Sequence, residues 1–158
     1  MDIKELYLKT IFCCMACDGD IAKEEIELVK NITSKQGTFG DINVEATINE
    51  YVTSINADGA SFLKKYLQEL GSQRLSDEEQ TKIVDFAIQT IFADNRIEYS
   101  EVKFFKKIRS RLSLTDEQIL AIHANIEDFL LPDINVEEDP IWDNIIFDNI
   151  NFAEYGKK

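Results

Sequence analysis

Proline is scarce in this chain of 158 residues: it occurs twice, and the first is Pro132. Because proline removes a backbone donor and ends or kinks a helix, residues 1–131 can form uninterrupted helices. The alternation of apolar and polar residues that indicates half-buried strands is not sustained anywhere. The sequence therefore predicts an all-α protein, in which a single-domain bundle of about seven helices spans residues 1–131.

Long apolar runs and paired cysteines are missing too. No apolar run approaches the ~20 residues of a membrane-spanning helix. Residues 1–5 alternate in charge, which does not match the pattern of a signal peptide. The three cysteines, Cys13, Cys14 and Cys17, are an odd number, and the single histidine, His123, completes no zinc site with them. We therefore expect a cytoplasmic protein whose cysteines are buried as small apolar residues.

Basic residues are few, with 17 Lys and Arg against 30 Asp and Glu, which gives a formal net charge of −13. A strongly acidic surface repels nucleic acid and anionic membranes, so neither is an expected partner. The charge is compatible with cations or basic partners, and also with solubility alone.

The usual signatures of an enzyme are absent from the sequence. There is no nucleophile–histidine constellation, no glycine-rich phosphate loop and no cofactor fingerprint. His123 lies among isoleucines on a predicted helix, which is typical of a helix-surface or half-buried histidine. The sequence predicts a non-enzymatic protein.

What the sequence does contain is an internal repeat. Residues 11–33 and 87–109 look like two copies of one unit, at a constant offset of 76 residues (94 − 18). Before each loop, the apolar positions match at the i, i+3, i+4, i+7 spacing of one helix face, and they match again after it. Each copy predicts a helix, an acidic loop and a second helix. We expect a pseudo-twofold axis to relate the two units.

Cap and turn signals locate the predicted helices. Four of them cover about residues 3–16, 23–36, 44–55 and 62–70, a fifth opens at Ser76, a sixth covers about 99–112, and a seventh opens at Thr115. Ser76 with Glu79, and Thr115 with Gln118, have the spacing of capping boxes. Gly71 is predicted to end the fourth helix. Asp58-Gly59 predicts an ordinary turn, because the rest of the loop motif does not follow it.

The two acidic loops share a spacing that suits a cation. In each loop an Asp precedes a turn residue, and a Glu follows seven positions after the Asp, as in the second half of an EF-hand calcium loop. The candidate metal ligands are Asp18, Glu25, Asp94 and Glu101, with Asp20, Glu24 and Glu98 as weaker candidates. Gly19 and Asn95 are the predicted turn residues, and Ile21 and Ile97 are predicted to pair their backbones.

The first half of an EF-hand is missing from both loops. Its upstream ligand positions hold Cys14 and Ala16 in one copy, and Thr90 and Phe92 in the other. One loop alone is therefore a poor site, whereas two loops together could bind calcium, magnesium or manganese. The alternative is that the carboxylates are structural, because an Asp before a turn and a Glu in a first helical turn accept backbone N–H bonds.

The doubled D-G-x-I-x-x-x-E motif, with Met15-Ala16-Cys17 before its first copy, resembles the TerB-like tellurite-resistance domain over about residues 3–130. The resemblance implies an all-helical fold, acidic loops that bind a divalent metal, and a role in bacterial stress responses. It carries over to Asp18, Gly19, Glu25, Asp94 and Glu101. The sequence departs from the family pattern at Ala22, Asn95 and Arg96.

Residues 132–158 differ in character from the rest of the chain. Acidic residues alternate there with large apolar ones, and Trp142, Ile145, Ile146, Phe147 and Ile150 approximate a helical stripe. A disordered tail rarely carries so many large apolar groups. We expect this segment to dock on the body of the protein or on a second copy.

Two functions follow from these observations. One is a TerB-like module that binds a divalent cation in a stress-response context. The other is a helical adaptor that binds a protein partner or associates with itself, and whose loop carboxylates are structural.

Overall fold

The computed structural model describes residues 3–17, 19, 21, 23–35, 39, 42–93, 99–124, 126, 147 and 150. Helices are the only regular secondary structure among these residues, so the prediction of an all-α bundle is confirmed. The helices are α1 (Ile3–Ala16), α2 (Lys23–Lys35), α3 (Val44–Asp58), α4 (Ala60–Ser72), α5 (Asp77–Ile91), α6 (Tyr99–Ser110) and α7 (Asp116–Ile122).

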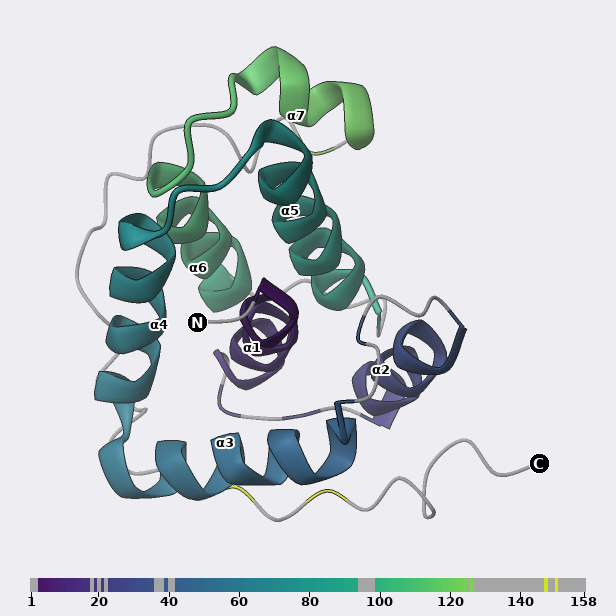
Figure 1. The fold of residues 1–158 in the computed structure, drawn as a ribbon, viewed down its shortest axis with the longest axis vertical. Coiled ribbons are helices and arrows are strands. Elements are labelled where there is room, and N and C mark those ends of the chain that lie inside the picture. The colour runs from purple at the N-terminus through teal and green to yellow at the C-terminus, as the bar shows by residue number, and fades with distance from the viewer. Residues whose placement is uncertain are drawn as a thin grey trace.

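Helix α1 is the centre of the bundle. Figure 1 shows it in the middle of the molecule, with α3, α4 and α5 around it, and it packs against these three and α6. Ten of its fourteen residues are buried, including Leu8, Ile11 and Phe12. A helix that is apolar on nearly all sides lies inside a fold instead of on its surface, which explains this central position.

The predicted capping boxes are confirmed. At the start of α5, Ser76 Oγ accepts from the N–H of Glu79 at 3.1 Å, and Glu79 returns a bond to the N–H of Ser76 at 2.9 Å. Thr115 and Gln118 make the same pair of bonds at the start of α7. These bonds satisfy backbone donors that the first helical turn leaves without a partner, which fixes where each helix begins.

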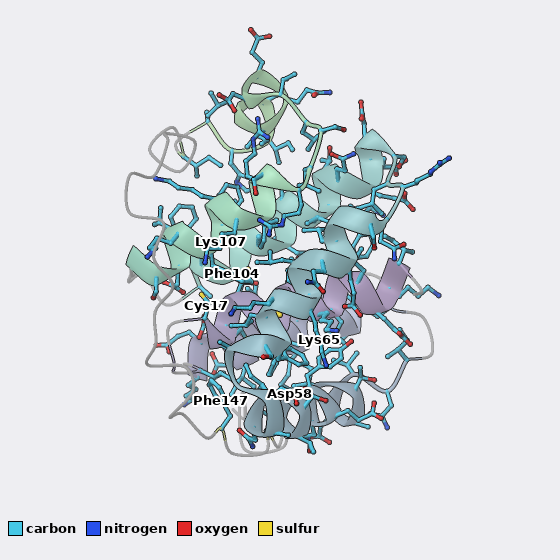
Figure 2. All side chains as sticks on the ribbon, turned by 90° about the vertical axis from the view of Figure 1, so that its left-hand side faces the viewer. Cys17, Asp58, Lys65, Phe104, Lys107 and Phe147 are labelled. Atoms are coloured by element: carbon cyan, nitrogen blue, oxygen red, sulfur yellow. The ribbon has the colours of Figure 1, made fainter. Side chains whose placement is uncertain are left out.

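The connection between α3 and α4 is a turn at Gly59. Its φ of 59° is left-handed, and its N–H donates to the carbonyl of Ile55 at 2.8 Å. Across this turn Lys65 Nζ of α4 lies 3.8 Å from Asp58 of α3 (Figure 2). Asp58 and Gly59 therefore form a helix–helix turn, as the sequence predicts.

One predicted helix end is wrong. Helix α4 continues through Gly71 to Ser72, and Gln73 is the residue that caps it. The glycine allows a close approach between segments: a Cβ at position 71 would lie 3.1 Å from Cγ of Arg111. Packing against the residue that follows α6, and not helix termination, explains why a glycine suits this position.

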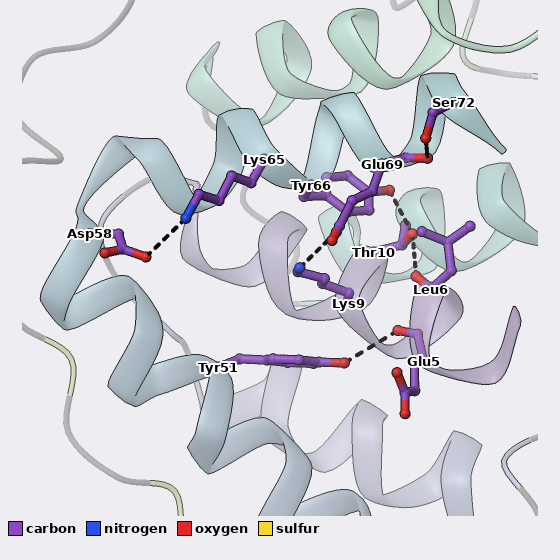
Figure 3. A network of polar contacts seen from close by, with 10 residues as sticks. All are labelled: Glu5, Leu6, Lys9, Thr10, Tyr51, Asp58, Lys65, Tyr66, Glu69 and Ser72. Carbon is purple, nitrogen blue, oxygen red and sulfur yellow. Dashed lines mark hydrogen bonds and ion pairs between the residues drawn. The ribbon is translucent and has the colours of Figure 1, made fainter. Parts of the chain in front are cut away.

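Polar contacts link α1 to α3 and α4 inside the bundle (Figure 3). The Thr10 and Tyr66 hydroxyls, both fully buried, lie 2.6 Å apart, and Thr10 also donates to the Leu6 carbonyl at 2.8 Å. Lys9 Nζ lies 2.7 Å from Glu69 and 5.0 Å from the ring centroid of Phe62. Because these bonds require particular side chains on two helices, they fix how α4 lies against α1.

The two copies of the repeat correspond to α1–α2 and α5–α6. Their first helices, α1 and α5, pack extensively against each other. A pseudo-twofold arrangement would bring these two helices together, but the symmetry itself stays a prediction.

Two residues of the C-terminal segment are described, and both lie against α3. Ile150 is buried in the core and Phe147 is half-buried beside it. In Figure 1 they are the two yellow stretches that follow α3, and Figure 2 labels Phe147 at the same end of the molecule as Asp58. Neither residue is helical, so the predicted helical stripe is wrong at these two positions: their backbone groups bond to side chains of α3 instead.

Candidate functional site

The glutamate that closes each acidic loop is buried. Glu25 lies in the first turn of α2 and Glu101 in the first turn of α6, with exposed fractions of 2% and 1%. Glu24, beside the first of them, is exposed. Carboxylates are rarely buried unless they are paired, hydrogen-bonded or bound to metal. Burial distinguishes Glu25 from Glu24 and Glu27, the other acidic residues of α2, and Glu101 is the one acidic residue of α6.

The two glutamates lie near one thiol at the end of α1. Burial raises the pKa of the Cys14 thiol well above its ordinary value, and negative charge on Cys13, Glu101 and Glu25 raises it further. Both carboxylates are therefore close enough to Cys14 to act on its ionisation. One predicted ligand from each unit therefore lies within electrostatic range of the same buried thiol.

The first acidic loop turns directly after α1. Gly19 has a φ of 87°, and its N–H donates to the carbonyl of Ala16 at 3.0 Å. Ile21 is half-buried and packs against the core. A residue with a side chain is strained at such a positive φ, so the predicted role of Gly19 as the turn residue is confirmed.

The remaining predicted loop residues lie outside the described part of the chain. These are Asp18, Asp20, Ala22, Asp94, Asn95, Arg96, Ile97 and Glu98. The backbone pairing of Ile21 with Ile97 and the contribution of the two aspartates to a metal site therefore stay predictions. Within the residues that are described, no group of three or more His, Cys, Asp or Glu could hold a metal ion.

The three cysteines are buried and none forms a disulfide, as predicted. Burial also raises the pKa of Cys13 well above its ordinary value, an effect that Lys9 opposes and Glu69 reinforces. Cys17 Sγ donates to the carbonyl of Cys14 at 3.3 Å. Thiols that stay protonated are poor nucleophiles and poor metal ligands, so Cys13 and Cys14 fit the role of small apolar residues.

His123 has a structural position. It caps the end of α7, is half-buried, and its Nε2 lies 2.9 Å from Oδ1 of Asp85 on α5. This contact ties α7 to α5. It supports the expectation of a half-buried histidine at a helix surface.

A second polar site was not predicted from the sequence. Asn49 and Asn56 lie on α3, seven residues apart, and both are half-buried. Asn49 accepts from the N–H of Ile150 at 2.7 Å and donates to its carbonyl at 2.8 Å. Asn56 makes the same two bonds with Phe147, at 2.7 and 2.9 Å. The sequence offers one signal for this site: asparagine is unfavourable inside a helix, so two asparagines seven residues apart in a predicted helix indicate a specific polar contact.

No helix in the described ranges is long and apolar enough to cross a membrane. Comparisons of the chain with protein families, with curated proteins and with solved structures gave no match. Its function is therefore inferred from its own residues and their geometry.

Proposed function

We propose that the chain is a non-enzymatic, cytoplasmic TerB-like module that binds a divalent cation and acts in a bacterial stress response of the tellurite-resistance type. The observation that carries the proposal is the pair Glu25 and Glu101. They occupy the same position in the two copies of the motif, both are buried, and both lie near the Cys14 thiol.

The donor set suits a hard cation. Calcium, magnesium and manganese prefer carboxylate and carbonyl oxygens, which the two glutamates and the loop aspartates Asp18 and Asp94 would supply. A cation would also offset the cost of burying two carboxylates. The protonated thiol of Cys14 takes no part in ligation in this scheme and excludes water from one side of the site.

The alternative function is a helical adaptor whose carboxylates are structural. A glutamate in the first turn of a helix complements the helix dipole without any metal. The contact between α3 and the C-terminal segment favours this reading, because it is a surface that binds a stretch of polypeptide.

Thermal melting of the chelated protein, with calcium, magnesium or manganese added back, separates the two functions. An ion that binds the native state stabilises it by about 2.7 kcal/mol at a hundred times its Kd, and so raises the Tm. The Glu25→Gln, Glu101→Gln double variant should lose that rise, whereas Glu24→Gln, at the exposed neighbour, should keep it. A wild-type Tm that none of the three cations changes would favour the adaptor.

A further inference from the structure

The asparagine pair on α3 recognises polypeptide backbone. Its four bonds to Phe147 and Ile150, the two residues of the C-terminal segment that the structure describes, all go to N–H and carbonyl groups. An asparagine amide that donates and accepts with the same residue imitates a neighbouring strand. Because the bonds do not involve side chains of the bound segment, they would form with any extended segment of suitable register.

The spacing of the pair selects an extended segment. Seven residues of helix rise about 10.5 Å, and three residues of an extended chain span about 9–10 Å. Three residues of a helix would span only about 4.5 Å and could not meet both asparagines. Asn49 binds the later residue and Asn56 the earlier one, so the segment runs antiparallel to α3.

Apolar side chains accompany the two recognised positions. Ile150 is 5% exposed and belongs to the core cluster, and Phe147 packs against that cluster. Burial of such side chains supplies affinity that the backbone bonds alone do not. The site therefore suits two apolar residues separated by two others.

The charge of the present occupant does not complement α3. The helix carries Glu45, Glu50 and Asp58 and no Lys or Arg, although Lys65 lies 3.8 Å from Asp58. Between positions 132 and 154 the C-terminal segment has seven acidic residues and no basic one: Asp133, Glu137, Glu138, Asp139, Asp143, Asp148 and Glu154. An acidic segment on an acidic helix is disfavoured relative to a basic one.

We propose that the Asn49–Asn56 face of α3 is a docking site for an extended, basic segment of a partner protein with two apolar residues three positions apart. The chain's own C-terminal segment occupies this site as an intramolecular competitor. A partner gains access by displacing residues 147–150, and its basic residues supply the charge complementarity that the acidic occupant lacks.

The test uses the full-length protein and fluorescein-labelled peptides of residues 141–153, one with the natural sequence and one carrying Asp143→Lys and Asp148→Lys. Weakening the internal occupant with Phe147→Ala and Ile150→Ala should tighten binding of the basic peptide at least about fivefold relative to wild type, because the competing state is less populated. The natural peptide should bind more weakly than the basic one, and the difference should shrink at high salt.

Two controls isolate the backbone contacts. Adding Asn49→Ala and Asn56→Ala to the undocked protein, which is the variant with Phe147→Ala and Ile150→Ala, should weaken peptide binding at least about tenfold. Thr53→Ala, at an exposed position on the same helix, should not weaken it. N-methylation of the peptide at the position of Ile150 removes the N–H that donates to Asn49. It should weaken binding to the wild-type protein as well, and this test does not depend on the folding of any variant.

Three results would overturn the proposal. One is equal affinity of the basic peptide for the undocked and wild-type proteins. Another is binding that survives both N-methylation and loss of the asparagines. The third is a concentration-dependent dimer that Phe147→Ala with Ile150→Ala dissociates in sedimentation, which would assign this face to a second copy of the chain.

Discussion

The buried glutamates at the starts of α2 and α6 and the asparagine pair on α3 are two candidate functional sites of this bundle, and they differ in charge and in burial. Glu25 and Glu101 are ionisable and almost fully enclosed, whereas Asn49 and Asn56 are neutral and half-exposed. Burying a charge costs far more than burying an amide, so the glutamates need a constant partner, from protein or from metal. The amides return to water at little cost, which allows the occupant of α3 to exchange.

Loss of the glutamates should have the largest effect. In chelated protein, Glu25→Ala with Glu101→Ala should lower the free energy of unfolding by about 1–3 kcal/mol per residue, because groups that interact with these buried carboxylates would be left without their partner. Urea denaturation measures this change. Glu24→Ala, one residue away and exposed, should stay within about 0.5 kcal/mol of wild type. An apo double variant as stable as wild type would show that the two carboxylates have no structural role.

The second largest effect should be a loss of folding stability at high pH, caused by the buried thiols of Cys13 and Cys14. Burial raises the pKa values of Cys13 and Cys14, while thiols of the unfolded chain ionise near pH 8.5. Above that pH the unfolded state binds fewer protons than the folded state. The contribution of the two thiols to the free energy of unfolding is therefore fully present below about pH 8 and is lost as the pH rises. The slope is at most about 1.4 kcal/mol per pH unit and thiol.

The measurement is the urea midpoint of unfolding between pH 7.5 and 9.5. Wild type should lose stability over this range, and the Cys13→Ala, Cys14→Ala variant should lose clearly less. Parallel pH profiles for the two proteins would contradict the assignment of the loss to these thiols. The cost of Asn49→Ala should not change over the same range, since an amide does not titrate.

Removal of the α3 amides should have a smaller effect. Asn49→Ala with Asn56→Ala removes four neutral, half-exposed hydrogen bonds and should lower stability by about 2 kcal/mol. It should also speed proteolysis of the C-terminal segment, which no longer has its backbone partners. If cleavage of that segment is as slow in the variant as in wild type, the amides do not hold it.

The smallest expected effect concerns the polar contact between α7 and α5. His123 and Asp85 are partly exposed, and such pairs contribute about 0–1 kcal/mol. His123→Ala should therefore change the urea midpoint little, which gives a baseline for the variants at the two candidate sites. If His123→Ala lowers the free energy of unfolding as much as the glutamate double variant does, burial does not determine how much each polar contact contributes to stability.

The helices could be predicted from the sequence because their signals are local. The 3.6-residue period of the apolar positions locates α1 and α5, and the residues of each capping box lie within four positions of one another. Gly71 was misread because its role depends on Arg111, forty positions later in the chain, and no local pattern records that approach.

The candidate sites were predictable to different degrees for the same reason. Glu25 and Glu101 could be found because the motif is repeated at constant spacing. Asn49 could not, because its partner Ile150 lies 101 positions away. The apolar residues of the C-terminal segment predicted a helix, but the backbone of Phe147 and Ile150 bonds to amides of α3 instead of to its own neighbours. Long-range polar contacts of this kind depend on the assembled bundle.

The most direct test of the proposed cation site is a manganese titration of the chelated protein, followed by the electron paramagnetic resonance signal of free Mn²⁺. A site shared by both acidic loops should bind one ion per chain, and the Glu25→Gln, Glu101→Gln variant should lose that binding while Glu24→Gln keeps it. Two ions per chain, or binding that the double variant retains unchanged, would contradict a shared site built on the two buried glutamates.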